Sequence, residues 1–238
     1  MEKTVSDAIN YRRSVRKFDP NKEIDVNIVK KCIKNGVLAP TSSNLQLWEF
    51  YHIINKDLLK KISKICFNQP AASTAKQIVI TVVRKDLWKL RSNQNIEFFN
   101  LKKKELSKKQ YDSTQKYYKI AIPFVYRDFL GILSIFKYII TNILGYFRVM
   151  YRQVKASDTR IVAHKSAALA SQNFMISMAG FGYDTCPMEG FDSLKIKHLL
   201  KLNKNSEINM IIGCGIRLEE GVYGERFRIP FEEVYFKK

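Results

Sequence analysis

The sequence is poor in the residues that hold metals or build disulfide frameworks. It has three histidines, and its four cysteines, Cys32, Cys66, Cys186 and Cys214, are scattered with no CxxC pair. A structural zinc site therefore lacks its usual ligand spacing, and we expect no metal and reduced, mostly buried thiols. The N-terminal stretch contains no apolar signal core, so a secretory route has no support and we expect a cytoplasmic protein.

Glycine, proline and acidic residues are also few. Ten glycines and six prolines in 238 residues, with 46% hydrophobic residues, exclude wholesale disorder and match a packed globular protein. A chain of this length can bury a core without disulfide or metal staples. Only 22 acidic residues stand against 41 lysines and arginines, which gives a formal net charge of +19. Polyanions, anionic membrane surfaces and phosphate-bearing ligands are therefore all candidate partners, and charge alone does not choose among them.

Motifs of the common hydrolases and nucleotide-binding enzymes are missing as well. The sequence has no GxSxG, P-loop, GxGxxG or HExxH motif. His52, His164 and His198 are far apart, and each is better interpreted as structural than catalytic. Any reaction would then be carried by a bound cofactor.

Hydrophobic periodicity predicts a mixture of helices and strands. Apolar residues have helical spacing near the N-terminus, from an N-cap at Asp25 to about residue 39, and at 58–66, 159–180 and 193–202. Runs rich in β-branched and aromatic residues predict strands at 48–54, 78–83 and 208–215, and 186–192 is expected to be a loop. Helix 159–180 is rich in small residues and is expected to be buried on most sides. Together these elements predict an α+β or α/β sandwich.

The segment 84–158 is the least regular part of the chain. It contains a nineteen-residue apolar run, 129–147, with Lys137 as its one charge. The favoured interpretation is a buried helix or a lid, because a lysine near the middle is costly in hydrocarbon. The second is an amphipathic helix on a membrane surface, through 127–152, with Arg127, Arg148 and Arg152 attracted to anionic lipid. A membrane-spanning helix is the third interpretation.

Two arginine-rich segments could hold a phosphate. The first contains Arg12, Arg13, Ser14 and Arg16, and the second, near the C-terminus, contributes Arg226 and Arg228 on one side of an extended chain. Guanidinium groups bind phosphate bidentately. The alternative is a solvated basic face, which is common in a chain of this charge.

Three polar loops could contact a ligand. Pro40, Thr41, Ser42 and Asn44 precede a predicted strand, and Asn68 and Gln69 follow a predicted helix. Their hydroxyls and amides could bind a heterocycle or a phosphate, although ordinary turn chemistry explains them equally well. In the third loop, Gly190 after Glu189 permits close approach of the backbone to a ligand.

These motifs, taken in order, resemble the FMN-dependent nitroreductase family. The resemblance is carried by 12–18, 39–44 with Gln46 and Trp48, 67–69, 186–192, and the C-terminal arginines. It implies an α+β fold, a three-layer sandwich with a central mixed β-sheet flanked by helices. It also implies an intertwined homodimer with two FMN sites at the subunit interface, and 1–238 as a single domain with an apolar lid or insertion at about 84–158.

The resemblance also implies which residues bind FMN. They are Arg12, Arg13, Ser14, Arg16, Pro40, Thr41, Ser42, Asn44, Asn68, Gln69, Pro187, Met188, Glu189, Gly190, Arg226 and Arg228. In the family the loop at 40–42 reaches the flavin from the partner subunit, the amides at 68–69 bind the isoalloxazine edge, and the backbone at 189–190 donates near N5. Arg16 would lie near N1 and O2. Some members have a lysine where this chain has Ala71.

The implied activity is ping-pong hydride transfer from NAD(P)H through FMN to a nitroaromatic, a quinone or a related acceptor, with no catalytic side chain. A long apolar lid favours a bulky or lipophilic acceptor. Alternatives on the same scaffold are a dehalogenase, an enone reductase or a flavin reductase. A membrane-surface protein is a further alternative. A nucleic-acid-binding protein is disfavoured because the lysines are spread out and no nucleic-acid motif is present.

Overall fold

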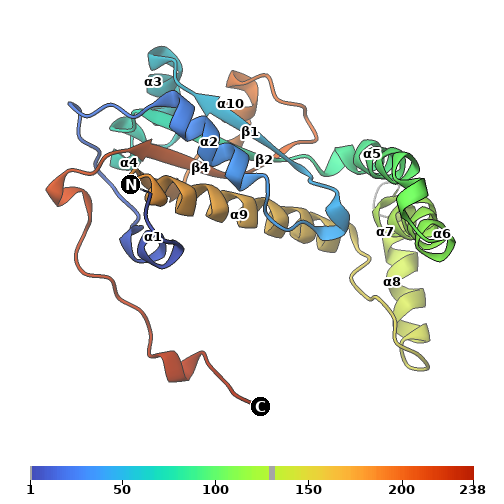
Figure 1. Ribbon diagram of the computed structural model, residues 1–238. Coiled ribbons are helices and arrows are strands. Elements are labelled where there is room, and N and C mark those ends of the chain that lie inside the picture. The colour runs from blue at the N-terminus through green and yellow to red at the C-terminus, as the bar shows by residue number, and fades with distance from the viewer. Residues whose placement is uncertain (1, 129–131) are drawn as a thin grey trace.

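The computed structural model describes residues 2–128 and 132–238. The helices are α1 (Val5–Tyr11), α2 (Val26–Gly36), α3 (Lys56–Ile65), α4 (Pro70–Ser73), α5 (Trp88–Leu101), α6 (Lys108–Lys116), α7 (Ile122–Tyr126), α8 (Ile132–Leu144), α9 (Ala156–Gly180) and α10 (Ser193–Leu199) (Figure 1). The strands are β1 (Trp48–Ile53), β2 (Gln77–Val83), β3 (Asp184–Met188) and β4 (Glu207–Gly215). The helices and strands expected from periodicity are all present, with ends shifted by a few residues.

The sheet has the order β1-β2-β4-β3, and its pairings in the described residues are antiparallel. The expectation of a mixed sheet was therefore wrong for this chain. Parallel pairing is confined, in the same residues, to one isolated bridge between Ser14 and Thr185 at the β3 edge. On the other side of the same segment, the N–H of Arg16 donates to Gly221 O at 2.6 Å.

The prediction of a loop at 186–192 was also wrong in part, because the first residues of this range belong to strand β3. Pro187 lies inside the strand and pairs with Ile212 of β4. A proline has no N–H to donate to a sheet, so it is tolerated on an edge strand, and β3 is at the edge. Pro187 and Gly190 lie close together in this segment, and both residue types are typical of loops, so the strand was not predicted.

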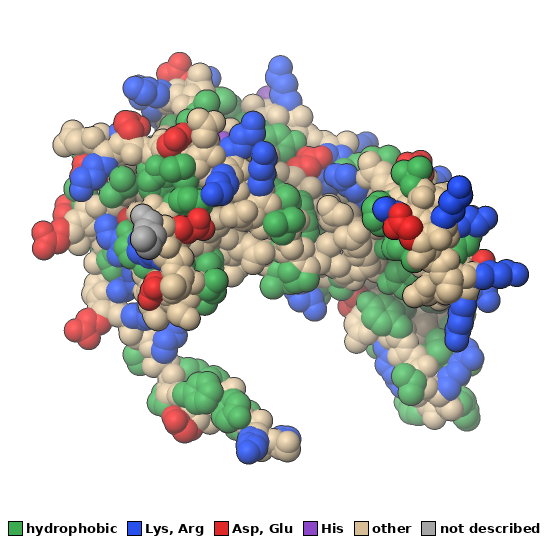
Figure 2. All heavy atoms as spheres, viewed as in Figure 1, with side chains coloured by type: hydrophobic (Ala, Val, Ile, Leu, Met, Phe, Trp, Pro, Cys, Tyr) green, Lys and Arg blue, Asp and Glu red, His purple; other side chains and the backbone are tan. Residues whose placement is uncertain are grey.

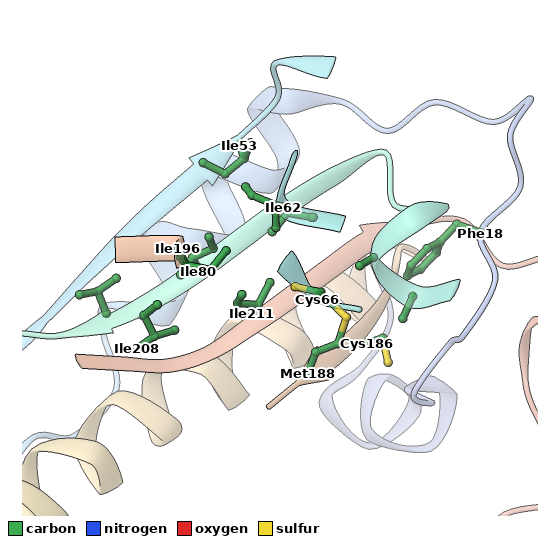
Figure 3. Packing of buried hydrophobic residues seen from close by; sticks show 14 of the residues in the cluster. Phe18, Ile53, Ile62, Cys66, Ile80, Cys186, Met188, Ile196, Ile208 and Ile211 are labelled. Carbon is green, nitrogen blue, oxygen red and sulfur yellow. The ribbon is translucent and has the colours of Figure 1, made fainter. Parts of the chain in front are cut away.

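The sheet is the middle of three layers, and β2 shows this most clearly because all of its residues are buried. Ile78 and Ile80 face a cluster that includes Ile62 of α3 and Ile196 of α10 (Figure 3). Val79, between them, faces the opposite cluster with residues of α2 and α9. The period of two along an extended strand thus sends neighbouring side chains into different layers.

Helix α9 starts at Ala156, three residues earlier than expected, and packs its small residues against the sheet and α2. Ala163, Ala167 and Ala170 are buried. Ile161 and Leu169 are nevertheless about half exposed in this chain, at 49% and 48%. The helix is therefore less enclosed in one chain than its composition predicts.

Segment 84–158 forms helices α5 to α8 at one end of the molecule (Figure 1). Trp88 and Tyr118 anchor it to the body through a cluster that contains Trp48 and Ala163. Part of the apolar run, 129–131, lies outside the described residues. Among the helices that the structure describes, none is long and apolar enough to cross a membrane. The four cysteines are buried and free, as expected.

Candidate functional site

An arginine-lined cavity of about 260 Å³ lies where the N-terminal and C-terminal segments meet. Its lining residues are Arg12, Arg13, Ser14, Arg16, Val222, Tyr223, Glu225, Arg226, Phe227 and Arg228. All six arginine-motif residues expected from the sequence are therefore brought together. Val222, Tyr223, Glu225 and Phe227 were not expected, and only their position beside the arginines could have indicated them.

Backbone acceptors on each segment hold arginines from the other. The Arg226 guanidinium donates to Arg12 O at 2.5 Å and to Asn10 O at 2.8 Å, and Arg13 donates to Gly224 O at 2.8 Å. The two segments approach closely at Gly221, where a Cβ atom would lie 2.3 Å from Lys17 O. Only glycine permits this contact, which positions the C-terminal arginines against the first segment.

A largely buried ion pair is connected to the first arginine of the cavity through Tyr11. Asp184, at the start of β3, pairs with Arg217 just after β4. Arg217 also donates to Tyr11 O at 3.2 Å and stacks on the Tyr11 ring at 4.3 Å. Because Tyr11 directly precedes Arg12, the pair links the edge of the sheet to the first arginine of the cavity.

The cavity carries an excess of positive charge. Burial lowers the pKa of the Arg12 guanidinium, and repulsion from Arg226, Arg228 and Arg13 lowers it further. Among the described residues that line the cavity, Glu225 is the one carboxylate. Crowded cations with too few counter-charges favour binding of an anion with several acceptor oxygens, such as a phosphate.

Strand β3 leads from the arginine cavity to the second group of predicted residues. At one end Val15 N donates to Thr185 O at 3.2 Å, beside Ser14. Past the other end, the Gln69 amide donates to Gly190 O at 2.9 Å. The sequence-predicted loops 68–69 and 189–190 are thus neighbours.

The predicted site residues of β3 and of the loops beside it differ in how far they are buried. The Met188 side chain is buried in the cluster on the α3 side, and its backbone lies in β3 opposite Ile211 of β4. Asn68 and Glu189 are exposed. Ala71 is 1% exposed in the same cluster, with its carbonyl oxygen against Gly213, so a lysine side chain has no room there.

The loop at 40–44 is remote from the arginine cavity within this chain. Ser42 N donates to the Ser166 hydroxyl, in the N-terminal half of α9, whereas the cavity lies near the helix's C-terminal end. Fourteen residues of α-helix separate Ser166 from Gly180, about 21 Å at 1.5 Å per residue. The Asn44 amide is also bonded to Asn95 of α5 at 2.9 Å. The structure therefore does not unite this loop with the arginines.

Backbone strain is concentrated in two of the predicted loops. Non-glycine residues with positive φ in the described chain are Ser43, Asn44, Gln46, Phe67, Asn68 and Lys201. All but Lys201 belong to the loops at 43–46 and 67–68. Such left-handed conformations are costly for residues with a Cβ and often occur at functional sites.

A buried hydroxyl that sequence reasoning missed lies next to Ser14. Thr185 is 1% exposed, and its Oγ1 atom has no hydrogen-bond partner in the part of the chain that the structure describes. A buried polar atom without a partner is expected near a ligand or ordered water. Its position could not be inferred because 185 was not expected to pair with 14.

The chain is similar to known proteins along most of its length. The nitroreductase family model matches residues 9–216. A Staphylococcus haemolyticus protein named as an NAD(P)H nitroreductase is 27% identical over 240 residues, covering 98% of this chain and 97% of that protein.

Two solved structures share the fold. A Bacillus subtilis nitroreductase structure has a TM-score of 0.74 at 22% identity, covering 98% of both chains. A nitroreductase from Exiguobacterium sibiricum, solved in complex with FMN, has a TM-score of 0.69 at 19% identity, covering 99% of this chain and 98% of that one. Since the family model spans most of the sequence, the chain belongs to the nitroreductase family.

Proposed function

We propose that this protein is an FMN-dependent oxidoreductase that transfers hydride from NAD(P)H to a nitroaromatic, a quinone or a related small acceptor. The observation that carries the proposal is the arginine-lined cavity on a chain of this family. Its donor set, guanidinium groups and the Ser14 hydroxyl, suits a phosphate monoester such as that of FMN. The uncompensated positive charge around Arg12 supports the same ligand.

The proposed cofactor contacts follow the cavity and β3. Arg12, Arg13, Ser14, Arg226 and Arg228 hold the phosphate, and Asn68 and Gln69 offer amides to the flavin ring. The backbone at Glu189 and Gly190 offers N–H donors, and Gln69 already fixes Gly190 O, which orients that turn. Arg16 lines the same cavity and provides positive charge for a reduced, anionic ring. When bound, FMN supplies the hydride chemistry.

A homodimer is part of the proposal because, within one chain, the predicted site residues at 40–42 lie far from the arginine cavity. The loop at 40–42 lies about 21 Å along α9 from the cavity's end of the helix. The segment after Gly221 extends away from the body as an arm (Figure 1), and its aromatic side chains, including Phe227, Phe231 and Phe236, are exposed. A partner subunit would cover this arm and the exposed Ile161 and Leu169 of α9, and would bring its own loop to the cavity.

The proposed lid, residues 84–158, carries a second cavity of about 340 Å³ suited to a flat, lipophilic acceptor. It begins at Ser42 and Ser43 and is lined by Phe124, Tyr126 and Tyr151 with other apolar residues. Burial raises the pKa of Tyr126 to about 12, so its phenol remains a hydrogen-bond donor. Aromatic walls with a few hydroxyl donors match a quinone better than a small, highly polar acceptor.

The first test is the visible absorption spectrum of the purified protein, followed by anaerobic addition of NADH or NADPH. A yellow protein that bleaches supports a bound, reducible flavin. A colourless protein that takes up no added FMN would overturn the cofactor assignment. A panel of nitroaromatics, quinones, enones, halogenated aromatics and free flavin then separates the activities that this scaffold could support.

A further inference from the structure

Helix α8 exposes its apolar side. Ile132, Ile135, Phe136, Ile139, Ile140 and Ile143 follow the spacing i, i+3, i+4, i+7, i+8, i+11, which places them on one stripe, and each is between 48% and 60% exposed. A helix on the surface of a soluble protein normally turns such a stripe toward the core. Here the stripe faces outward.

The polar side of the same helix faces the protein. Ser134 and Thr141 are buried, at 5% and 1% exposure. The Lys137 ammonium donates to Phe124 O at 2.9 Å and to Arg127 O at 2.6 Å, at the C-terminal end of α7. Carbonyl groups at a helix C-terminus are favourable partners for a cation. The charge in the middle of the apolar run is therefore bound to the protein and lies off the apolar stripe.

The chain after α8 extends this surface with an aromatic tip. Tyr146, Phe147 and Val149 are among the most exposed hydrophobic residues of the protein, and Arg148 lies between them. Arg152 supports the turn by donating to Gly145 O at 2.7 Å and to Asn142 Oδ1 at 2.8 Å. Aromatic side chains beside arginine are typical of the membrane–water interface.

The charges of residues 127–155 indicate which kind of surface contacts this part of the protein. Residues 127–155 contain five basic side chains, those of Arg127, Lys137, Arg148, Arg152 and Lys155, and one acidic side chain, that of Asp128. Two copies of this surface placed together would bring like charges into contact. A span is excluded for the described helix because thirteen residues extend only about 20 Å, against about 30 Å of hydrocarbon. Figure 2 shows hydrophobic and basic side chains gathered at the tip of this end of the molecule.

We propose that the outer face of α8 and the tip at 146–149 dock the protein onto the surface of an anionic lipid bilayer. The apolar stripe enters the boundary between headgroups and acyl chains, and the basic side chains contact lipid phosphates. Lys137 stays on the protein side, where it fixes α8 to α7.

The test is co-sedimentation of the full chain with vesicles of phosphatidylcholine alone and with vesicles in which about a third of the lipid is phosphatidylglycerol. We expect binding to the anionic vesicles, at least about tenfold weaker binding to the neutral ones, and release at about 0.5 M salt. Equal binding to both vesicles, or no binding to either, would overturn the proposal.

Variants locate the contact. Phe136→Ser/Ile139→Ser should reduce binding to anionic vesicles at least about tenfold, and Arg148→Glu should reduce it in a salt-dependent way. Leu101→Ser/Leu194→Ser, which removes two leucines outside α8 that are even more exposed, at 85% and 73%, is the control and should bind as the parent does. Unchanged binding of the α8 variant would contradict the proposal.

The alternative is that a second copy of the chain covers the outer face of α8. Light scattering without lipid tests this alternative. We expect the α8 variant and the parent to have the same mass in solution. A smaller assembly for the variant alone would assign α8 to a contact between copies and overturn docking on lipid. Circular dichroism of each variant checks that the fold is retained.

Discussion

Asp184 and Arg217 form an ion pair in which the carboxylate side chain is only 1% exposed. The two residues belong to neighbouring elements, the edge strand β3 and the segment after β4, and Arg217 also donates to the backbone of Tyr11. The pair therefore connects the sheet to the place where the arginine motif begins. Removing one partner leaves the other charge without its counter-ion in a largely buried place.

Asp184→Asn should lower the free energy of unfolding by about 3 kcal/mol, because breaking one side of a buried pair is strongly destabilising. Urea unfolding followed by circular dichroism measures this. Glu105→Gln, which breaks the exposed Lys102–Glu105 pair, is the control and should change stability by less than about 1 kcal/mol. Equal effects of the two substitutions would mean that the buried pair contributes no more than a surface one.

Arg13→Ala should weaken FMN binding by about 10- to 100-fold, since a hydrogen bond to a charged group contributes about 1.5–3 kcal/mol. Quenching of flavin fluorescence in a titration of the apoprotein measures the dissociation constant. Arg148→Ala, at the distant tip of the lid segment, is the control and should leave binding unchanged. A parallel loss in both variants would indicate a general charge effect in place of a local contact.

Gly221→Ala should impair FMN binding and stability together. The added Cβ would lie 2.3 Å from Lys17 O, so the C-terminal segment must move away and take Arg226 and Arg228 with it. Gly224→Ala is the matched control because its φ of +65° costs about 1 kcal/mol but its Cβ meets no atom within 4 Å. Comparison of both variants by FMN titration and urea unfolding tests the prediction, and equal FMN affinities would refute it.

Alkaline pH should destabilise the protein partly through Tyr126. Burial raises the pKa of its phenol from 10.0 to about 12. Below pH 10 the group is neutral in both states; above it the unfolded chain ionises first, so stability falls as the pH rises toward 12. The loss is at most about 3 kcal/mol for a two-unit shift.

Urea unfolding at about pH 8, 10 and 11 checks this, because the stability of Tyr126→Phe should fall less steeply than that of the parent. Tyr146→Phe, which removes an exposed phenol, is the control and should follow the parent curve. Identical pH profiles for the Tyr126 variant and the parent would contradict the assignment.

Periodicity predicts the elements whose pattern is local. The continuous apolar run of β2 and the Asp25 cap of α2 are of this kind, and both were predicted from the sequence. Strand β3 was missed because Pro187 signals a loop unless its edge position is known, and edge position depends on β4, which is distant in the sequence. The apolar stripe of α8 is visible in the sequence, but periodicity does not say whether a stripe faces the protein or the solvent.

The candidate site likewise has some features that follow from local sequence patterns and others that depend on long-range contacts. Arginines grouped in two short segments indicated a phosphate clamp, and the structure gathers them around one cavity. The support from Asp184 and Arg217, and the buried hydroxyl of Thr185, depend on contacts between residues far apart along the chain. Neither contributes a recognisable pattern to the sequence.

The bond between Arg226 and the carbonyl of Arg12 joins residues 214 positions apart. Because the cavity exists only after the intervening sheet and helices have formed, the unfolded chain has no equivalent place for a phosphate. A ligand of this cavity therefore binds the native state alone. At a hundredfold excess over its dissociation constant it raises the free energy of unfolding by about 2.7 kcal/mol, and the melting temperature rises with it. The concentration of the cofactor therefore affects how long the folded protein survives heat and proteolysis.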